Sequence, residues 1–299
     1  MSTTEDHTSG GLREGYAEIG DVRLHYVEAG DGPLIVLLHG FPEFWYGWRL
    51  QIRPLAAAGF RVVAPDLRGY NLSSKPDGVA AYDIGPLAAD IRGLVQERGA
   101  ESALLVGHDW GGTVAWATAM NHPEVVDRLA ILNAAHPRKL SQGLRHPGQL
   151  RKSWYFFFFA LPELPESVVH ANHWHFFRNF LDDAHPAYTP EEIERYVEAW
   201  SQPGAATAMI NYYRASVRQS PKHAEAQLRP ISAPTLVIWG QRDRYLGQDL
   251  AEPDHDDVPN LDRVERLPDA SHWVHHDEPE RVTQLLVDFF APARPTENR

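Results

Sequence analysis

One aspartate stands in a strand–turn–helix pattern that could present its carboxylate for chemistry. Residues 103–106 are an apolar run too short for an ordinary helix, residues 107–111 are Gly-His-Asp-Trp-Gly, and a helix-like pattern follows. This order is typical of a nucleophile elbow, where a sharp turn exposes one side chain above a sheet. The usual serine is Asp109 here, and a carboxylate that attacks carbon becomes an ester. The motif alone is equally compatible with an aspartate that only caps the helix.

A nucleophilic aspartate needs a base that activates water to break the ester, and that base needs an acid to orient it. Asp243 follows the apolar run 235–239, and His272 lies in a loop beyond a predicted strand at 263–267. All three residues thus follow strand ends, where open α/β sheets build their sites. Their chain order of nucleophile, acid and histidine is that of α/β-hydrolase triads.

Other roles for these residues have to be weighed. Asp243 could be a turn residue, and His272 has two neighbours, His275 and His276, that could offer metal ligands. That histidine cluster has no partner motif, and no His-Glu-x-x-His pattern occurs. Three suitable residues in the right order favour a triad, so we expect no metal and no cofactor.

Hydrolysis of the ester creates an oxyanion on the Asp109 carboxyl carbon, which backbone N–H groups must stabilise. The N–H of Trp110, directly after the nucleophile, is one candidate. The N–H of Phe41, within the His-Gly-Phe-Pro sequence at 39–42, is the other, although this sequence could also be a plain turn after a strand.

The elements that must position these residues alternate between strands and helices. Apolar runs predict a hairpin at 16–27 and strands at 34–38, 61–64, 103–106 and 128–132, with helices between them. From 137 to 228 the pattern is helical, aromatic-rich and broken by prolines, and the strand–helix alternation resumes at 235. We predict an α/β fold, a mostly parallel sheet flanked by helices (residues 1–136 and 229–299), with an inserted helical cap at 137–228.

Composition bounds the function further. The 299 residues are 43% hydrophobic, which suffices for a large core with an inserted subdomain. The formal charge of −12 disfavours nucleic-acid binding, and the lack of cysteine excludes disulfides and thiol catalysis. No run is long enough to span a bilayer and no signal peptide is evident, so we expect a cytoplasmic protein without a membrane partner.

Together these motifs resemble the α/β-hydrolase-fold epoxide hydrolases over about residues 15–292. The resemblance rests on residues 39–42, Asp-Leu-Arg-Gly-Tyr at 66–70, the elbow, Asp243, and Ser-His-Trp at 271–273. It implies a tyrosine on each of two cap helices, which we assign to Tyr155 and Tyr213. Tyr212 would point about 100° away from Tyr213 on a helix, so one of the two should face the site.

The leaving group separates the possible activities. An epoxide leaves as an alkoxide, which needs an acid such as a phenol to protonate it, whereas a halide leaves as a stable anion. We therefore expect hydrolysis of an apolar epoxide to a vicinal diol. For turnover Asp109 should be ionised, both tyrosines protonated, and His272 neutral so that it can act as the base. We also expect His39, Pro42 and Trp154 in the substrate pocket.

Two alternatives stay open. Haloalkane dehalogenases share the aspartate nucleophile, and Trp110 could bind a halide through its indole N–H. A catalytically silent α/β-hydrolase that binds a ligand is the other. In either case the partners are a small molecule and water, and the chain is a monomer or a homodimer.

Overall fold

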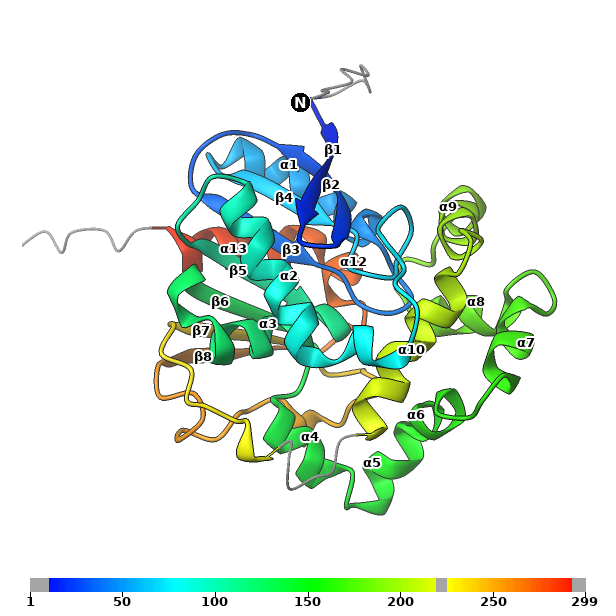
Figure 1. The fold of residues 1–299 in the computed structure, drawn as a ribbon. Helices are drawn as coiled ribbons and strands as arrows, with labels where there is room; N and C mark the ends of the chain where they lie inside the picture. Colours follow the sequence, from blue (N-terminus) through cyan, green and yellow to red (C-terminus); the bar gives the residue numbers. More distant parts are fainter. Residues whose placement is uncertain (1–10, 219–224, 292–299) are drawn as a thin grey trace, which may run out of the picture.

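The computed structural model describes residues 11–218 and 225–291, and its centre is an eight-stranded sheet (Figure 1). The strand order is β1-β2-β4-β3-β5-β6-β7-β8. β2 pairs antiparallel with β1 and β4, and all other neighbours are parallel. The bounds are β1 (Arg13–Ile19), β2 (Val22–Ala29), β3 (Leu34–Leu38), β4 (Arg61–Pro65), β5 (Ala103–His108), β6 (Val126–Leu132), β7 (Thr235–Gly240) and β8 (Leu261–Leu267).

The central strands are apolar throughout because helices cover both faces of the sheet. Along β3, Ile35 and Leu37 enter one buried cluster, while Val36 and Leu38 enter the other. Helices α2 (Ile84–Glu97) and α3 (Trp110–Asn121) pack on one face, and α1 (Arg49–Ala57) and α13 (Pro279–Phe290) on the other. This confirms the predicted α/β-hydrolase architecture, with β1, β6 and β8 each starting two or three residues earlier than the sequence pattern indicated.

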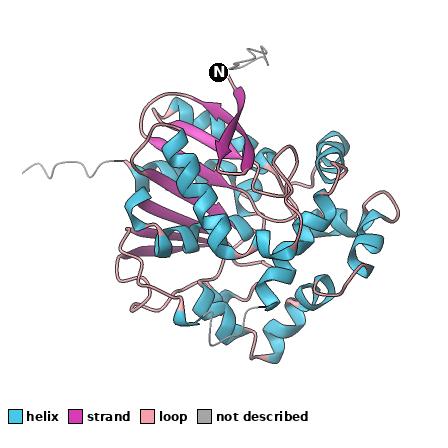
Figure 2. Ribbon diagram, in the orientation of Figure 1, coloured by secondary structure: helices cyan, strands magenta, loops and turns pink. Residues whose placement is uncertain are grey.

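In the described residues between β6 and β7 the regular elements are helices, and Figures 1 and 2 show them gathered on one side of the sheet. We call α4 to α10 the inserted helices. α9 begins with a capping box, in which Thr189 accepts from the N–H of Glu192 and the Glu192 carboxylate accepts from the N–H of Thr189. The bounds are α4 (Pro137–Gly143), α5 (Pro147–Lys152), α6 (Trp154–Phe159), α7 (Leu164–His170), α8 (His175–Leu181), α9 (Pro190–Trp200) and α10 (Ala205–Arg218).

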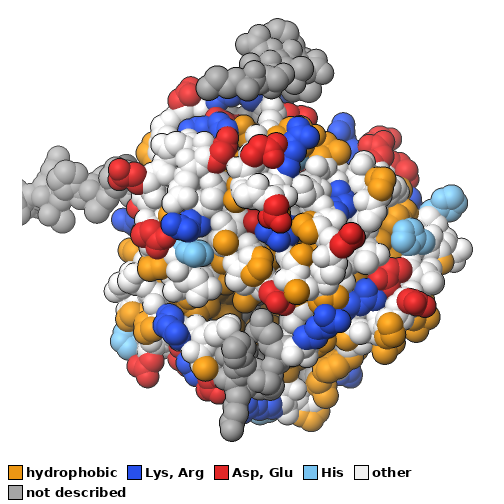
Figure 3. All heavy atoms as spheres, in the orientation of Figure 1, with side chains coloured by type: hydrophobic (Ala, Val, Ile, Leu, Met, Phe, Trp, Pro, Cys, Tyr) orange, Lys and Arg blue, Asp and Glu red, His pale blue; other side chains and the backbone are white. Residues whose placement is uncertain are grey.

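The surface carries acidic and basic side chains interspersed on the face shown in Figure 3. Within residues 11–218 and 225–291, no helix combines the length and the apolar character needed to cross a bilayer. The predicted boundaries of the sheet domain and the cap include residues 1–10, 219–224 and 292–299, which lie outside the described chain.

Candidate active site

Asp109 occupies a sharp turn between the end of β5 and the start of α3. Its φ of 48° is unusual for a residue with a side chain, and such a conformation costs about 1–3 kcal/mol that the surrounding structure must offset. Gly111 permits the turn, because a Cβ there would collide with the backbone oxygens of Leu38 and His39. The side chain of Asp109 retains 17% exposure, so the elbow presents its carboxylate rather than burying it.

His272 lies between two carboxylates, in the loop between β8 and α12 (Val274–Asp277). Its Nδ1 is 2.7 Å from Oδ2 of Asp243, and its Nε2 is 3.6 Å from Oδ2 of Asp109. The structure therefore brings together three residues that are separated by up to 163 positions, as the spacing at strand ends predicted. The imidazole is oriented by Asp243 and faces the elbow carboxylate.

Asp243 is fixed by more hydrogen bonds than any other member of the trio. Its Oδ1 accepts from the backbone N–H groups of Tyr245 and Leu246, at 2.7 and 2.9 Å. Asn133, directly after β6, donates to Oδ2 at 2.7 Å and accepts from the N–H of Gly240. Sequence reasoning missed Asn133, although a polar residue at the end of a buried strand is the signal that could have found it.

The charges of the trio follow from this arrangement. Burial raises the pKa of Asp243, but His272 and the hydrogen bonds outweigh it and hold that pKa below its ordinary value. Burial lowers the pKa of His272, yet Asp243 and Asp109 together raise it well above its ordinary value. The two carboxylates therefore favour the protonated form of His272, whereas the hydrolysis expected from the sequence requires the neutral form as base.

Phe41 approaches the nucleophile from the loop after β3. Its N–H donates to Oδ1 of Asp109 at 2.8 Å, as an oxyanion-hole donor would. Gly40 makes this approach possible, since a Cβ there would lie 2.5 Å from Cβ of Asp109. Trp110 is the first residue of α3, where backbone N–H groups have no partner within the helix.

Two tyrosines from the inserted helices, Tyr155 of α6 and Tyr213 of α10, face Asp109 across a small cavity. The cavity has about 10 Å³, roughly the space of one water, and is also lined by His272 and Phe41. The tyrosine rings are 5.9 Å apart between centroids. Burial first and the Asp109 charge second raise the pKa of both hydroxyls well above the ordinary value, so both stay protonated.

Tyr212 does not line the small cavity, as helical geometry predicted, although it does line the larger cavity described below. Its hydroxyl donates to the carbonyl of Arg68 at 2.7 Å, in the loop after β4. A second cavity of about 560 Å³ adjoins the elbow and is lined by Asp109, Trp110 and Tyr155. Its volume lies within the range usual for small-molecule sites.

Three residues expected in the pocket lie outside both cavities, so these expectations are corrected. His39 is fully buried and uses its two ring nitrogens on the Gly40 carbonyl and the Leu67 N–H. Pro42 is buried, with its carbonyl accepting from the indole of Trp200. Trp154 is 52% exposed, because successive positions of α6 point in different directions and Tyr155 takes the inward one.

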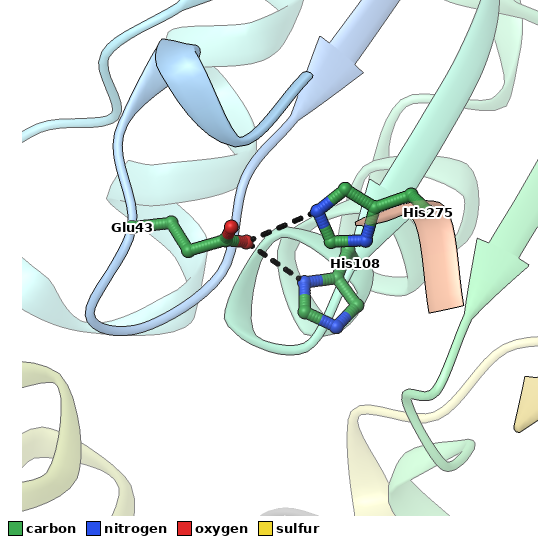
Figure 4. A group of neighbouring side chains, drawn as sticks. All are labelled: Glu43, His108 and His275. Carbon is green, nitrogen blue, oxygen red and sulfur yellow. Dashed lines mark hydrogen bonds and ion pairs between the residues drawn. The ribbon is translucent and has the colours of Figure 1, made fainter. Parts of the chain in front are cut away.

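Behind the trio lies a buried cluster of Glu43, His108 and His275 (Figure 4). Oε2 of Glu43 is 3.2 Å from Nδ1 of His108 and 3.4 Å from Nε2 of His275. Nε2 of His108 donates to the carbonyl of His272 at 2.9 Å. The cluster thus joins the Phe41 loop, the elbow and the His272 loop.

The same cluster supplies His275 with neighbouring candidate metal ligands, which no sequence motif had indicated. Two imidazoles and a carboxylate are a donor set that zinc accepts, and the candidate ligand atoms lie within 4.8 Å of one another. Each contact is equally a hydrogen-bond or ion-pair distance. The expectation that the protein needs no metal therefore stays a prediction.

Comparison with known proteins shows the family to which this chain belongs. The model of the α/β-hydrolase fold family matches residues 33–279. The chain is 42% identical to the AB hydrolase superfamily protein YfhM of Bacillus subtilis over 93% of this chain and 98% of that protein. It is 38% identical to epoxide hydrolase 4 of Homo sapiens, over 92% of this chain and 78% of that protein.

Solved structures agree with these relatives. The crystal structure of Bacillus megaterium epoxide hydrolase in complex with an inhibitor is similar, with a TM-score of 0.83 and 32% identity over 92% of this chain and 99% of that one. The chain belongs to the epoxide hydrolases of the α/β-hydrolase fold family, which are hydrolases acting on ether bonds.

Proposed function

We propose that the protein hydrolyses an apolar epoxide to a vicinal diol through an ester on Asp109. In the first step Oδ2 of Asp109 attacks an epoxide carbon, while Tyr155 and Tyr213 hydrogen-bond to the ring oxygen and one of them protonates it. The single observation that carries the proposal is the small cavity in which both tyrosines and His272 surround Asp109. The product of this step is a neutral hydroxyalkyl ester.

In the second step water gives a proton to His272 and attacks the carboxyl carbon of Asp109. The bond from that carbon to Oδ2 then breaks, Oδ2 leaves in the diol with the proton from His272, and the carboxyl proton left on Asp109 returns to the tyrosine phenolate. Ester formation removes the negative charge of Asp109, which is one of the groups that raise the pKa of His272. The pKa of His272 therefore falls at the stage where a neutral base is required, and Asp243 stabilises the imidazolium that forms. Oδ1, which already accepts from the Phe41 N–H, becomes the oxyanion, with the Trp110 N–H as second donor.

The tyrosines favour an epoxide over a halide as the leaving group. Two protonated phenols suit an alkoxide, which must gain a proton, better than a halide, which leaves as an anion. Haloalkane dehalogenation stays the second candidate because Trp110 lines the larger cavity. Turnover of styrene oxide and of a bromoalkane by the same preparation separates the two, and faster turnover of the bromoalkane would favour dehalogenation.

The covalent step is tested by a single turnover of styrene oxide in heavy-oxygen water. Water attacks the ester carbonyl, so the label is expected in the Asp109 carboxylate, detected by mass spectrometry of the peptide that contains it. Label in the diol and none in Asp109 after one turnover would exclude the ester. If Asp109→Asn leaves ligand binding and biological activity unchanged, the catalytically silent alternative is favoured.

The wider role remains a set of predictions. Conversion of a reactive epoxide to a diol would suit detoxification, and the substrate and water are the only partners the reaction requires. A cytoplasmic location, and a monomer or homodimer, are predicted from the sequence. Within the proposal, the inserted helices at 137–228 act as the cap of a sheet domain formed by residues 1–136 and 229–299.

A further inference from the structure

The buried cluster of Glu43, His108 and His275 contains an imidazole without a hydrogen-bond partner (Figure 4). The side chains of all three residues are 0% exposed. Within residues 11–218 and 225–291, neither ring nitrogen of His275 forms a hydrogen bond. Buried polar groups are almost always satisfied, so a buried imidazole in this state points to a partner from outside the chain.

His108 presents a lone pair to Glu43 rather than a proton. Its Nε2 donates to the carbonyl of His272 at 2.9 Å, which makes Nδ1 of the neutral imidazole an acceptor. Oε2 of Glu43, which is also an acceptor, lies 3.2 Å from that Nδ1. Two acceptors at this distance require a cation between them, either a proton or a metal ion.

The position of His275 favours a metal ion over a proton. Its Nε2 lies 3.4 Å from the same oxygen, Oε2 of Glu43. A proton between Glu43 and His108 would satisfy that pair and leave His275 without a partner, whereas a metal ion can bind all three. Around a tetrahedral zinc with bonds of about 2.0–2.1 Å, neighbouring ligand atoms are about 3.3 Å apart, close to both contacts of Oε2.

The groups around the cluster orient it as they orient metal ligands. The second nitrogen of His108 is held by a backbone carbonyl, and Oε1 of Glu43 accepts from the Tyr196 hydroxyl at 3.2 Å. Burial disfavours Mg²⁺, which keeps several waters when bound. Two histidines and one glutamate are the protein ligands of known zinc sites, in which a water completes the tetrahedron.

We propose that Glu43, His108 and His275 bind one Zn²⁺, which links the three loops of the active site. Glu43 follows Phe41 by two residues, His108 directly precedes the nucleophile, and His275 follows His272 by three residues. The ion has no part in the proposed covalent steps. Metal content and the hydrolysis of styrene oxide are therefore independent measurements.

Metal analysis of the purified protein tests the site directly. Tag-free protein is produced with added Zn²⁺ and passed through a chelator-containing column, which removes ions from exposed histidines. Mass spectrometry of the metals should find about one zinc per chain in wild type and almost none in His275→Gln or Glu43→Gln. Wild type without zinc, or equal zinc in wild type and His275→Gln, overturns the proposal.

His276→Gln is the matched control, because His276 is an adjacent buried histidine outside the cluster. Its Nδ1 contacts the Arg49 guanidinium, and its Nε2 donates to the carbonyl of Pro186. His276→Gln should retain the zinc of wild type. Loss of zinc in this control equal to that in His275→Gln overturns the assignment of the ligands.

Cobalt substitution reports the geometry and requires no variant, so it decides the case even if His275→Gln fails to fold. Wild type produced with Co²⁺ should show the strong visible absorption of a tetrahedral ion, and the weak spectrum of an octahedral ion overturns the proposal.

Thermal unfolding tests whether the ion links the loops. Zinc-loaded wild type should unfold about 5 °C above wild type produced in zinc-depleted medium, the shift expected at about 100 times Kd. His275→Gln should unfold at the same temperature with and without zinc. Equal unfolding temperatures of the two wild-type preparations overturn the proposed link.

Discussion

The trio Asp109, His272 and Asp243 and the pair Tyr155 and Tyr213 meet at one cavity but are held in opposite ways. The trio sits on loops after β5, β7 and β8, and Asp243 alone accepts four hydrogen bonds, from His272, Asn133 and two backbone N–H groups. The tyrosines come from the inserted helices and are held by ring contacts with Phe41, Phe156 and Phe180. Within the described residues the Tyr155 hydroxyl has no hydrogen-bond partner.

This difference separates two tasks. Hydrogen bonds fix the direction of His272 and the carboxylates, as ester formation and hydrolysis require. Packing leaves the Tyr155 hydroxyl available to a ligand that enters between the tyrosines and Asp109, whereas the Tyr213 hydroxyl shares a hydrogen bond with the Trp110 side chain. Changes to the trio should therefore stop the covalent chemistry of any substrate, whereas changes to the tyrosines should affect the departure of the epoxide oxygen.

The largest effect is expected from the nucleophile. Asp109→Asn should reduce turnover of styrene oxide by about 10⁴-fold or more, the scale of triad removal in other hydrolases. His272→Gln is the informative partner, because it should still form the ester but fail to hydrolyse it. Intact-mass spectrometry after mixing with styrene oxide should show an adduct on His272→Gln and none on Asp109→Asn. An adduct on both variants would place the nucleophile elsewhere.

The tyrosine pair should act on the first step alone. Replacing Tyr155 and Tyr213 together by Phe should slow ester formation by about 10²–10⁴-fold, the usual contribution of general acid catalysis. Hydrolysis of ester already formed should change little, as followed by rapid-quench measurements. Tyr212→Phe is the control, since that hydroxyl is bonded to Arg68, and it should leave ester formation close to wild type. Equal losses in the control and the double variant would contradict the assignment.

The charge of His272 should report the state of Asp109. Because Asp109 raises the pKa of His272, Asp109→Asn, which resembles the neutral ester, should lower that pKa, and Asp243→Asn should lower it also. The comparison is made by NMR titration of the imidazole in the three proteins. In wild type His272 stays protonated below its raised pKa and loses the proton as pH rises through it. An identical pKa of His272 in wild type and Asp109→Asn would contradict the proposal that ester formation lowers the pKa of His272.

The smallest effect is expected at Trp154. Its side chain is half exposed and lines neither cavity, so Trp154→Ala should leave kcat/KM for styrene oxide within about twofold and stability within about 0.5 kcal/mol. Phe159→Ala, in contrast, removes a fully buried ring and should cost about 3–5 kcal/mol of unfolding free energy. Denaturant titration with parallel activity assays tests both, and a large activity loss in Trp154→Ala would return this residue to the pocket.

The sequence alone determined the elements and the chemistry that each strand end offers. Apolar runs bounded by turns located the central strands, because burial on both faces leaves no other composition for them. The types and order of Asp109, Asp243 and His272 followed from the needs of covalent hydrolysis. The direction of Tyr212 away from Tyr213 followed from the helical period.

Tertiary structure decided everything that depends on contacts between distant segments. The local sequence pattern could not show that both ring nitrogens of His39 are hydrogen-bonded to the backbone. It also could not show that Trp154 faces solvent while its neighbour Tyr155 faces Asp109. Nor could it bring Asn133 to Asp243, or Glu43 to His275, because these partners are more than 100 positions apart. The protonation of His272 also belongs to the fold, since a pKa depends on which charges lie within a few ångströms and how much water they lose.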